Sequence, residues 1–418
     1  MKMKCGVCFL VVLVLFCNVC CAETLTVSVC FDEYFAPPDN ADDPNPDPNV
    51  IYYETPEYAA LKEFQELHPD CEVKIIVNAP VEEKSEADVF LLSGSLTDIH
   101  KVINSPYVQS IQAYLPKDTV TNVLCLDKLV NKNNELVAVP IYAWAFAVYP
   151  NGEMISFLPE QDQTILLDSL KSWDDIYVFG SKLKKEGFAS YVIAGLPYMA
   201  CQLLGLTQNA PGSFENVKGQ ITDLLDLWKK MAKEGILEVP KTFEKLSFEV
   251  SRNSLLNFDI AYVYDIQEAM TGIKTEYPFY PVPMCGLSFQ SPLRMEVGVV
   301  SSSCDNIPLA AEFLSAFTTM ENQKMFAHSG IIRSDLYAYM KEEKEIDSVW
   351  YKDQESWWGE LIPEESYALY NKTVCEGFIP SITDAQLLLF AWDVADYIND
   401  KVSVTKIIDW LEEYYVQY

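Results

Sequence analysis

The side chains best suited to hold a ligand are acidic, aromatic and hydroxyl residues that follow strand-like segments. Asp32, Glu33 and Tyr34 come directly after the first such segment, and Ser93 and Ser95 come directly after the third. Carboxylates accept hydrogen bonds from sugar hydroxyls, and an aromatic face suits the C–H face of a sugar ring. The same residues also suit an ammonium group, through charge pairing and cation–π attraction. Carbohydrates and organic cations are therefore the two ligand classes that these residues favour.

Further candidates lie in the middle of the chain, on an extended run or close to the end of a strand. They are Tyr142, Trp144, Tyr198, Tyr262, Tyr264 and Asp265. Core packing is the alternative for every ring, because alternation along a strand buries one side whatever the function. We expect Trp144 to contribute binding energy more than stability.

The sequence contains no motif for catalysis, a cofactor or a metal. It lacks a G-x-S-x-G elbow, a P-loop and a glycine-rich dinucleotide turn. Its three histidines have no ligand spacing, and the acidic, proline-rich loop 37–49 lacks the glycine and final glutamate of an EF-hand. We therefore predict a protein that is not an enzyme and that uses neither a cofactor nor a metal.

Composition narrows the range of partners. The formal net charge is −31, which repels nucleic acid, while 50% hydrophobic and 13% aromatic residues indicate a packed globular protein. There are no internal repeats of the kind expected of an adhesion or structural module. The prediction is a monomer that binds a small molecule.

The first 22 residues read as a secretory leader. Lys2 and Lys4 precede an apolar run at 5–16 that is too short to span a bilayer, and small residues favour a cut after Ala22. An uncleaved anchor is one alternative, and lipidation of a leader cysteine is another. The cysteines placed for lipidation are Cys17, Cys20 and Cys21. In either case we predict an exported protein, periplasmic or at the cell surface.

Seven cysteines follow the leader, an odd number. Cys30 and Cys71 flank the first two strand-like segments and could lie close together. Two alternatives follow for them, a disulfide bond or free buried thiols.

The elements that position these residues alternate between strands and helices. Strands are expected at 25–30, 73–77 and 88–92, with helices at 56–67 and 96–102. This rhythm is typical of a parallel sheet that binds ligands at the carboxyl ends of its strands. Later segments continue the mixed pattern. We expect an extended run at 136–148, strands at 259–264 and 295–300, and helices at 173–185, 214–234, 309–317, 321–328, 384–398 and 404–415.

Several short motifs stand in a fixed order along the chain. They are Val139-Pro140 through Tyr149-Pro150-Asn151, Ser172-Trp173-Asp174-Asp175-Ile176, Phe258–Tyr262, Gly298–Ser301, Asn306–Leu314 and Ile379-Pro380. This order resembles the extracellular solute-binding proteins of ABC transporters, in the branch that includes maltose-binding protein. The resemblance covers nearly the whole chain after the leader.

The resemblance implies a two-lobed α/β fold of the type II periplasmic-binding-protein kind. Each lobe is then a sheet flanked by helices, and crossing hinge strands join the lobes. It places lobe one at 23–143 and 298–335, lobe two at 144–297, and closing helices at 336–418. It implies capture of a small ligand, a carbohydrate by preference, and delivery to an ABC permease. Binding of a polyamine or another organic cation by the same fold is the alternative.

The chain also departs from that family's pattern. The loop at 37–49 is an addition, and Leu92, Ser95 and Gln386 stand where maltose binders carry Asp and Trp. Tyr198 matches the tyrosine of the family's sugar-stacking turn, although the glutamate of that turn is missing.

Overall fold

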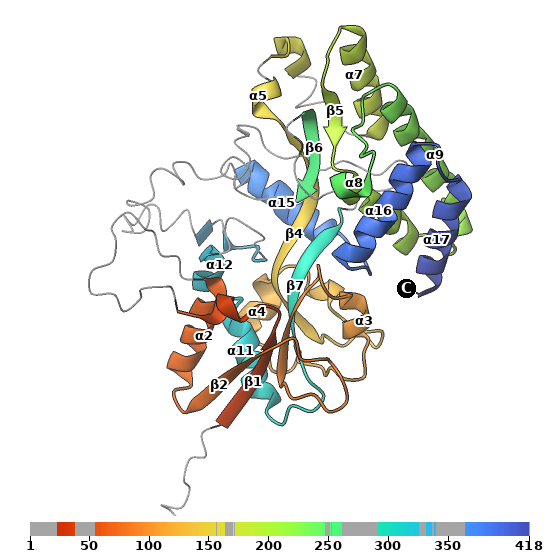
Figure 1. Ribbon diagram of the computed structural model, residues 1–418. Helices are drawn as coiled ribbons and strands as arrows, with labels where there is room; N and C mark the ends of the chain where they lie inside the picture. Colours follow the sequence, from red (N-terminus) through yellow and green to blue (C-terminus); the bar gives the residue numbers. More distant parts are fainter. Residues whose placement is uncertain are drawn as a thin grey trace, which may run out of the picture.

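The computed structural model shows one sheet that runs through two lobes (Figure 1). It describes residues 23–37, 55–155, 157–163, 170, 172–246, 251, 253–260, 291–325, 332–336, 338–339 and 364–417. Across the sheet the strands are β2 (Cys71–Val77), β1 (Glu23–Val29), β3 (Val89–Ser93), β7 (Leu293–Val300), β4 (Ala138–Pro150), β6 (Ser254–Ile260) and β5 (Tyr191–Ala194). The leader 1–22 and nearly all of loop 37–49 lie outside the described residues.

Lobe one is built on β1, β2 and β3, which run parallel. Its helices are η1 (Asp32–Phe35), α2 (Pro56–Leu67), α3 (Ile99–Ile103), α4 (Lys117–Asn122), η2 (Leu126–Lys128), α11 (Ile307–Ala316) and α12 (Met320–Met325). Phe64 of α2 meets Phe313 of α11 edge to face, with the ring centroids 5.3 Å apart. This contact joins two helices about 250 residues apart in sequence, so the chain must return to lobe one to complete its core.

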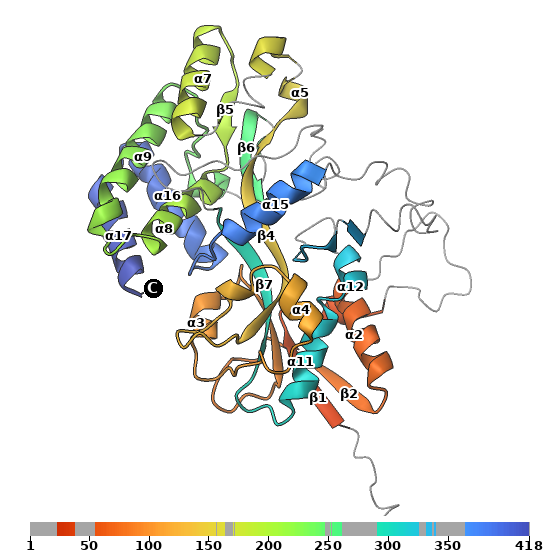
Figure 2. The ribbon, with the colours of Figure 1, turned by 180° about the vertical axis from the view of Figure 1, so that it is seen from behind.

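Lobe two is built around β5 and β6, which are parallel to each other. Its helices are α5 (Gly152–Ile155), α7 (Trp173–Lys185), α8 (Leu196–Gln208), α9 (Glu215–Lys233), η3 (Phe243–Lys245), α15 (Glu364–Glu376), α16 (Asp384–Ile398) and α17 (Val404–Gln417). Trp173 and Trp228 are fully buried and meet at 5.4 Å, and the Trp173 indole donates to Gln202 at 2.7 Å. In the view of Figure 2, α15 crosses in front of β4.

Strands β4 and β7 are shared by both lobes. Antiparallel pairing joins them from Ala138–Val299 to Ala145–Leu293, after which β4 pairs with β6. The lobe boundaries predicted at 143/144 and 297/298 fall on these two strands, and they stay predictions. The pairing register shifts between Pro140 and Tyr142, so Pro140 lies at a bulge inside a continuous strand and does not end it.

The two-lobed α/β fold expected from the sequence is confirmed. Helices 56–67, 173–185 and 384–398 have the predicted ends, and the side chains of Thr55, Ser172 and Thr383 cap their first turns. Two boundaries were wrong. The helix predicted at 96–102 begins at Ile99 with Asp98 as its cap, and the strand predicted at 259–264 is already formed at Ser254.

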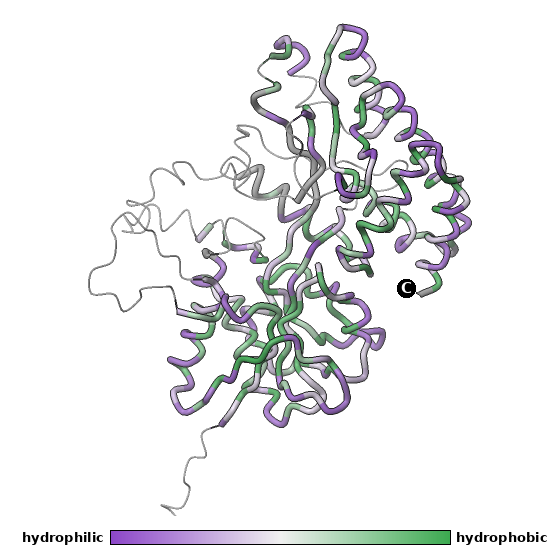
Figure 3. Tube along the Cα trace, viewed as in Figure 1, coloured by the Kyte–Doolittle hydropathy of each residue, from purple (hydrophilic) through white to green (hydrophobic). Residues whose placement is uncertain are grey.

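Helix α8 was not predicted, since it gives no amphipathic signal. Its residues from Leu196 to Thr207 are all buried, so apolar side chains surround the helix axis. The outer helices of lobe two differ, and Figure 3 shows hydrophilic residues along their exposed faces. None of the described helices is long and apolar enough to cross a membrane. Cys30 and Cys71 are free thiols.

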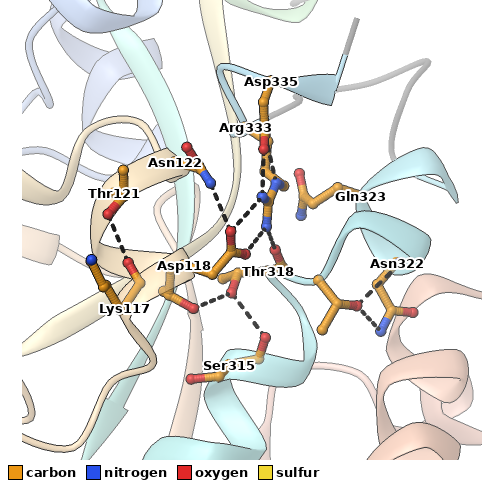
Figure 4. A network of polar contacts seen from close by, with 12 residues as sticks. Lys117, Asp118, Thr121, Asn122, Ser315, Thr318, Asn322, Gln323, Arg333 and Asp335 are labelled. Atoms are coloured by element: carbon orange, nitrogen blue, oxygen red, sulfur yellow. Dashed lines mark hydrogen bonds and ion pairs between the residues drawn. The ribbon is translucent and has the colours of Figure 1, made fainter. Parts of the chain in front are cut away.

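A buried arginine closes lobe one on the side of α4 (Figure 4). The Arg333 side chain is 3% exposed and donates to the Asp118 carboxylate at 2.7 Å, to Asp335 at 2.7 Å and to the Thr318 carbonyl at 2.8 Å. Its charge and hydrogen bonds lower the pKa of Asp118. Because this guanidinium is satisfied on several sides, it fixes segment 332–336 against α4 and the end of α11.

Replacing Arg333 by Met should destabilise the protein by about 3 kcal/mol, because Asp118 and Asp335 lose their buried partner. The urea midpoint measures this loss. Lys218→Met removes an exposed ion pair with Glu215 and serves as the control, with an expected change below about 1 kcal/mol. Equal midpoints for the two variants would contradict the structural role of Arg333.

Gly298 marks the closest packing of β7 on α11. A Cβ atom there would lie 2.2 Å from Cδ2 of the buried Leu314. Gly298→Ala should therefore lower stability by roughly 1–3 kcal/mol through overpacking. The matched control is Gly219→Ala on α9, where a Cβ meets nothing within 4 Å. The control should raise stability by about 0.5–1 kcal/mol, since alanine favours helix. Urea midpoints that move in the same direction would refute this account.

Candidate functional site

Polar and aromatic side chains gather where three strands meet between the lobes. The pairing places Tyr142 opposite Glu296 and Trp144 opposite Arg294, and it places Ser93 of β3 opposite Glu296 on the other side. Directly paired residues share one face of a sheet, and residues two apart on a strand do so too. One face of the crossing therefore carries a hydroxyl, a carboxylate and two aromatic rings.

A second group comes from the carboxyl end of β1 and the start of α2. Tyr34 lies in η1, directly after β1, and the Thr55 hydroxyl that caps α2 donates to the Tyr34 carbonyl. Glu57 lies in the first turn of α2. Glu57 and Tyr34 both lie close enough to Glu296 for its charge to contribute to their raised pKa values. Residues from η1, α2, β3, β4 and β7 thus converge on one place.

Burial dominates the electrostatics of this place. Burial, together with the nearby charge of Glu296, raises the pKa of Glu57 to about 7. Burial also raises the pKa of Glu296, against hydrogen bonds from Tyr142 and Ser93 and the charge of Arg294, which lower it. The pKa of Tyr142 lies well above its usual value, because burial and both carboxylates oppose its ionisation. Tyr142 is therefore a hydrogen-bond donor to Glu296 at neutral pH.

Trp144 stands at the junction of the two cores. Its ring meets Tyr142 edge to face, with centroids 4.5 Å apart and planes at 63°. It packs partly buried against the apolar residues of both lobes. Its indole nitrogen is buried and meets no acceptor within the described part of the chain. A buried indole N–H without an acceptor is unusual, because such donors are normally satisfied.

The other predicted residues are placed as follows. Asp32 and Glu33 are exposed on η1. The Ser95 hydroxyl lies 2.7 Å from that of Ser93, while the Ser95 carbonyl accepts from the Asp384 amide of lobe two. Tyr198 is 4% exposed and packs in the core of lobe two. Three more, Tyr262, Tyr264 and Asp265, lie outside the described residues.

Sequence reasoning missed Glu57 and Glu296. Glu296 had a signal, since a carboxylate within the apolar strand Leu293–Val300 needs a reason to be there. Glu57 had none, because an acidic residue in the first turn of a helix is ordinary. Only the fold brings it to the strand ends.

The lobes also touch beside this place, through α3 and the start of α16. The Ser381 hydroxyl donates to the Asp98 carboxylate at 2.9 Å, and the His100 ring lies 2.9 Å from the Ile379 carbonyl. Arg294 of β7 forms an ion pair with Asp384 at 2.6 Å. These contacts hold the two lobes together at one edge of the crossing.

A separate hollow lies on lobe one between α2, α4 and α11. Its wall includes Phe64, Leu67 and Ala316, with Glu63 and Glu312 at polar positions. None of the predicted ligand residues lines it. We place the candidate site at the strand crossing, because convergent strand ends and buried carboxylates are found there.

Comparison with known proteins shows a likeness in structure without one in sequence. No protein-family model matches the chain, and no curated protein sequence matches it. Among solved structures, it is similar to the cyclic α-maltosyl-1,6-maltose binding protein of Arthrobacter globiformis, with a TM-score of 0.62, 14% identity, and coverage of 94% of this chain and 97% of that one.

Two further structures agree. A family 1 extracellular solute-binding protein of Alicyclobacillus acidocaldarius has a TM-score of 0.61 at 12% identity, covering 95% of this chain and 98% of its own. The GacH receptor of Streptomyces glaucescens, solved unliganded and with acarbose, has a TM-score of 0.59 at 13% identity, with coverage of 95% and 98%. The chain thus has the fold of extracellular solute-binding proteins, as the sequence motifs indicated. These similar structures are binding proteins and not enzymes.

The half-buried acid Glu57 should make stability depend on pH. Its pKa in the folded protein, about 7, exceeds the value of 4.5 for an ordinary glutamate. The folded state therefore holds more protons between these values, and its stability falls as pH rises through that window. Glu57→Gln should raise stability at pH 8 by on the order of 2 kcal/mol and change it little at pH 4.5.

Urea midpoints at the two pH values measure this difference. Glu66→Gln, on the exposed side of the same helix, is the control and should give the same small change at both. A pH-independent effect of Glu57→Gln would show that Glu57 is not a buried acid.

Proposed function

We propose that this protein is an exported solute-binding protein that captures a small carbohydrate between its lobes and delivers it to an ABC transporter permease. The observation that carries the proposal is the ring pair Tyr142–Trp144 beside Glu57 and Glu296, on strands shared by both lobes. In this proposal the protein acts as a monomer and performs no chemistry on its ligand.

The site offers what a sugar needs. Trp144 and Tyr142 present aromatic surface to the C–H face of a ring, while the carboxylates and the Ser93 hydroxyl bind its hydroxyl groups. Carboxylates accept charge-assisted hydrogen bonds, which are stronger than neutral ones. A small polar solute is therefore bound by stacking and by directed hydrogen bonds together.

The crossing strands make the site responsive to ligand. A solute that touches both lobes favours the closed arrangement over the open one by its difference in affinity for the two. In this proposal the lobe-one side is Tyr34, Glu57, Ser93 and Glu296. The lobe-two side is the predicted set Tyr262, Tyr264 and Asp265, without Tyr198, which packs in the core of lobe two.

The names of the similar structures support a carbohydrate. They include maltose-binding, maltodextrin-binding and acarbose-binding proteins. The charge of the site favours the second candidate, an organic cation, because buried carboxylates stabilise an ammonium group.

Isothermal titration of the purified protein with a panel of oligosaccharides and with spermidine tests the proposal. We expect at least one oligosaccharide to bind with micromolar or tighter affinity, and deletion of the protein to abolish uptake of that sugar. If spermidine binds and none of the sugars does, the ligand is an organic cation and not a carbohydrate.

Trp144→Ala should weaken binding of the sugar found in this way by about 1–3 kcal/mol, the usual loss for an aromatic anchor. Its urea midpoint should also fall, because the ring packs on both cores. Trp410→Ala is the matched control, since Trp410 stacks on Phe390 within lobe two at 4.2 Å. It should lose stability and keep its affinity. Equal affinities for both variants and the parent protein would assign Trp144 to the core.

A further inference from the structure

Resting on the proposed function, we propose that the carbohydrate carries a protonated amine. Its ammonium group binds at Glu57 and Glu296, and one of its hydroxyl oxygens accepts the indole N–H of Trp144. The inference names the chemical class of the solute, an amino sugar or an oligosaccharide that contains one.

The first observation is the charge around the two carboxylates. Within the described part of the chain, neither Glu57 nor Glu296 forms an ion pair with a lysine or arginine. Arg294 lies near Glu296, but its guanidinium is paired with Asp384 at 2.6 Å. Burial of unpaired carboxylates is costly, and a cation between them removes that cost. The site therefore prefers a ligand that brings positive charge.

The second observation concerns the hydrogen-bond acceptor positions of the Glu296 carboxylate that are not already used. Tyr142 and Ser93, one on each neighbouring strand, form hydrogen bonds with it. A carboxylate has about four acceptor positions. Two of them thus hold the group in place, and the remainder are available to an ammonium group, which carries three donors in its primary form.

The rings around the carboxylates suit the same ligand. Burial raises the pKa of Tyr34, and the nearby charges of Glu57, Glu33 and Glu296 add to that rise, while Tyr142 forms a hydrogen bond with Glu296. An ammonium group bound by these carboxylates therefore lies beside tyrosine rings, whose faces attract cations. Charge pairing and ring contact favour the same atom of the ligand.

The third observation is independent of charge. The buried indole nitrogen of Trp144 lacks an acceptor within the described residues, and its ring adjoins Tyr142 on the same strand face. Indole N–H is a donor only, so it requires an acceptor atom on the ligand. A protonated polyamine has no acceptor and would leave this donor unsatisfied. A sugar hydroxyl satisfies it, so the structure favours a solute with both hydroxyl and ammonium groups.

Calorimetry with paired glycans tests the inference. Each glucosamine oligosaccharide is compared with its N-acetylated counterpart of the same length and linkage, with maltotetraose and spermidine alongside. We expect the free amine to bind at least tenfold more tightly than the acetamide. If the free amine and its acetamide bind with equal affinity, or if only maltotetraose binds, the ligand is a carbohydrate but amine recognition is refuted. Binding of spermidine alone, or of no compound, would overturn both.

Substitutions at the site test which residue contacts which group of the ligand. Glu57→Gln should weaken binding of the free amine at least tenfold more than it weakens binding of the acetamide, whereas the surface control Glu66→Gln should change neither. Trp144→Phe keeps an aromatic ring and removes only the N–H donor, so it should weaken both members of a pair alike. A Glu57→Gln effect of equal size on amine and acetamide would refute charge recognition, even if the sugar still binds.

Discussion

The antiparallel pairing of β4 with β7 is the constraint on which the rest of this structure depends. Backbone hydrogen bonds along this ladder fix Tyr142 against Glu296 and Trp144 against Arg294, so the site is set by main-chain register. The same two strands run from lobe one toward lobe two; they supply buried residues to the core of lobe one, and Trp144 of β4 packs against the core of lobe two as well. A slip of β4 by one residue would turn both rings to the face opposite the Glu296 carboxylate.

Local structure was largely predictable from the sequence, and the site only in part. Helices 56–67, 173–185 and 384–398 were predicted correctly because their apolar periodicity lies close together in sequence, and the structure adds that Thr55, Ser172 and Thr383 cap them. Helix α8 was missed because it is apolar all round. Glu57 was missed for a different reason. Nothing near it in the chain shows that its helix begins beside a strand almost 240 residues later.

The predicted aromatic residues illustrate the same limit. Periodicity places Tyr142 and Trp144 on one face, but it cannot tell which face is covered. The structure shows Tyr142 8% exposed and bonded to Glu296, and Trp144 between two cores. Tyr198, chosen by likeness to a turn motif, lies in the first turn of a buried helix. Long-range packing decides which side of each residue is covered, and this packing cannot be predicted from the local pattern of a single sequence.

The bulge at Pro140 has a mechanical consequence. It leaves Ile141 as the extra residue, whose carbonyl accepts from the buried Gln323 side chain at 3.2 Å, and Gln323 also bonds the Phe317 carbonyl. The crossing strand is therefore held on its lobe-one side by a buried side chain from outside the sheet. Because Gln323 faces the bulge and not the ring pair, the anchoring of the strand and the residues at the candidate site can vary independently in sequence.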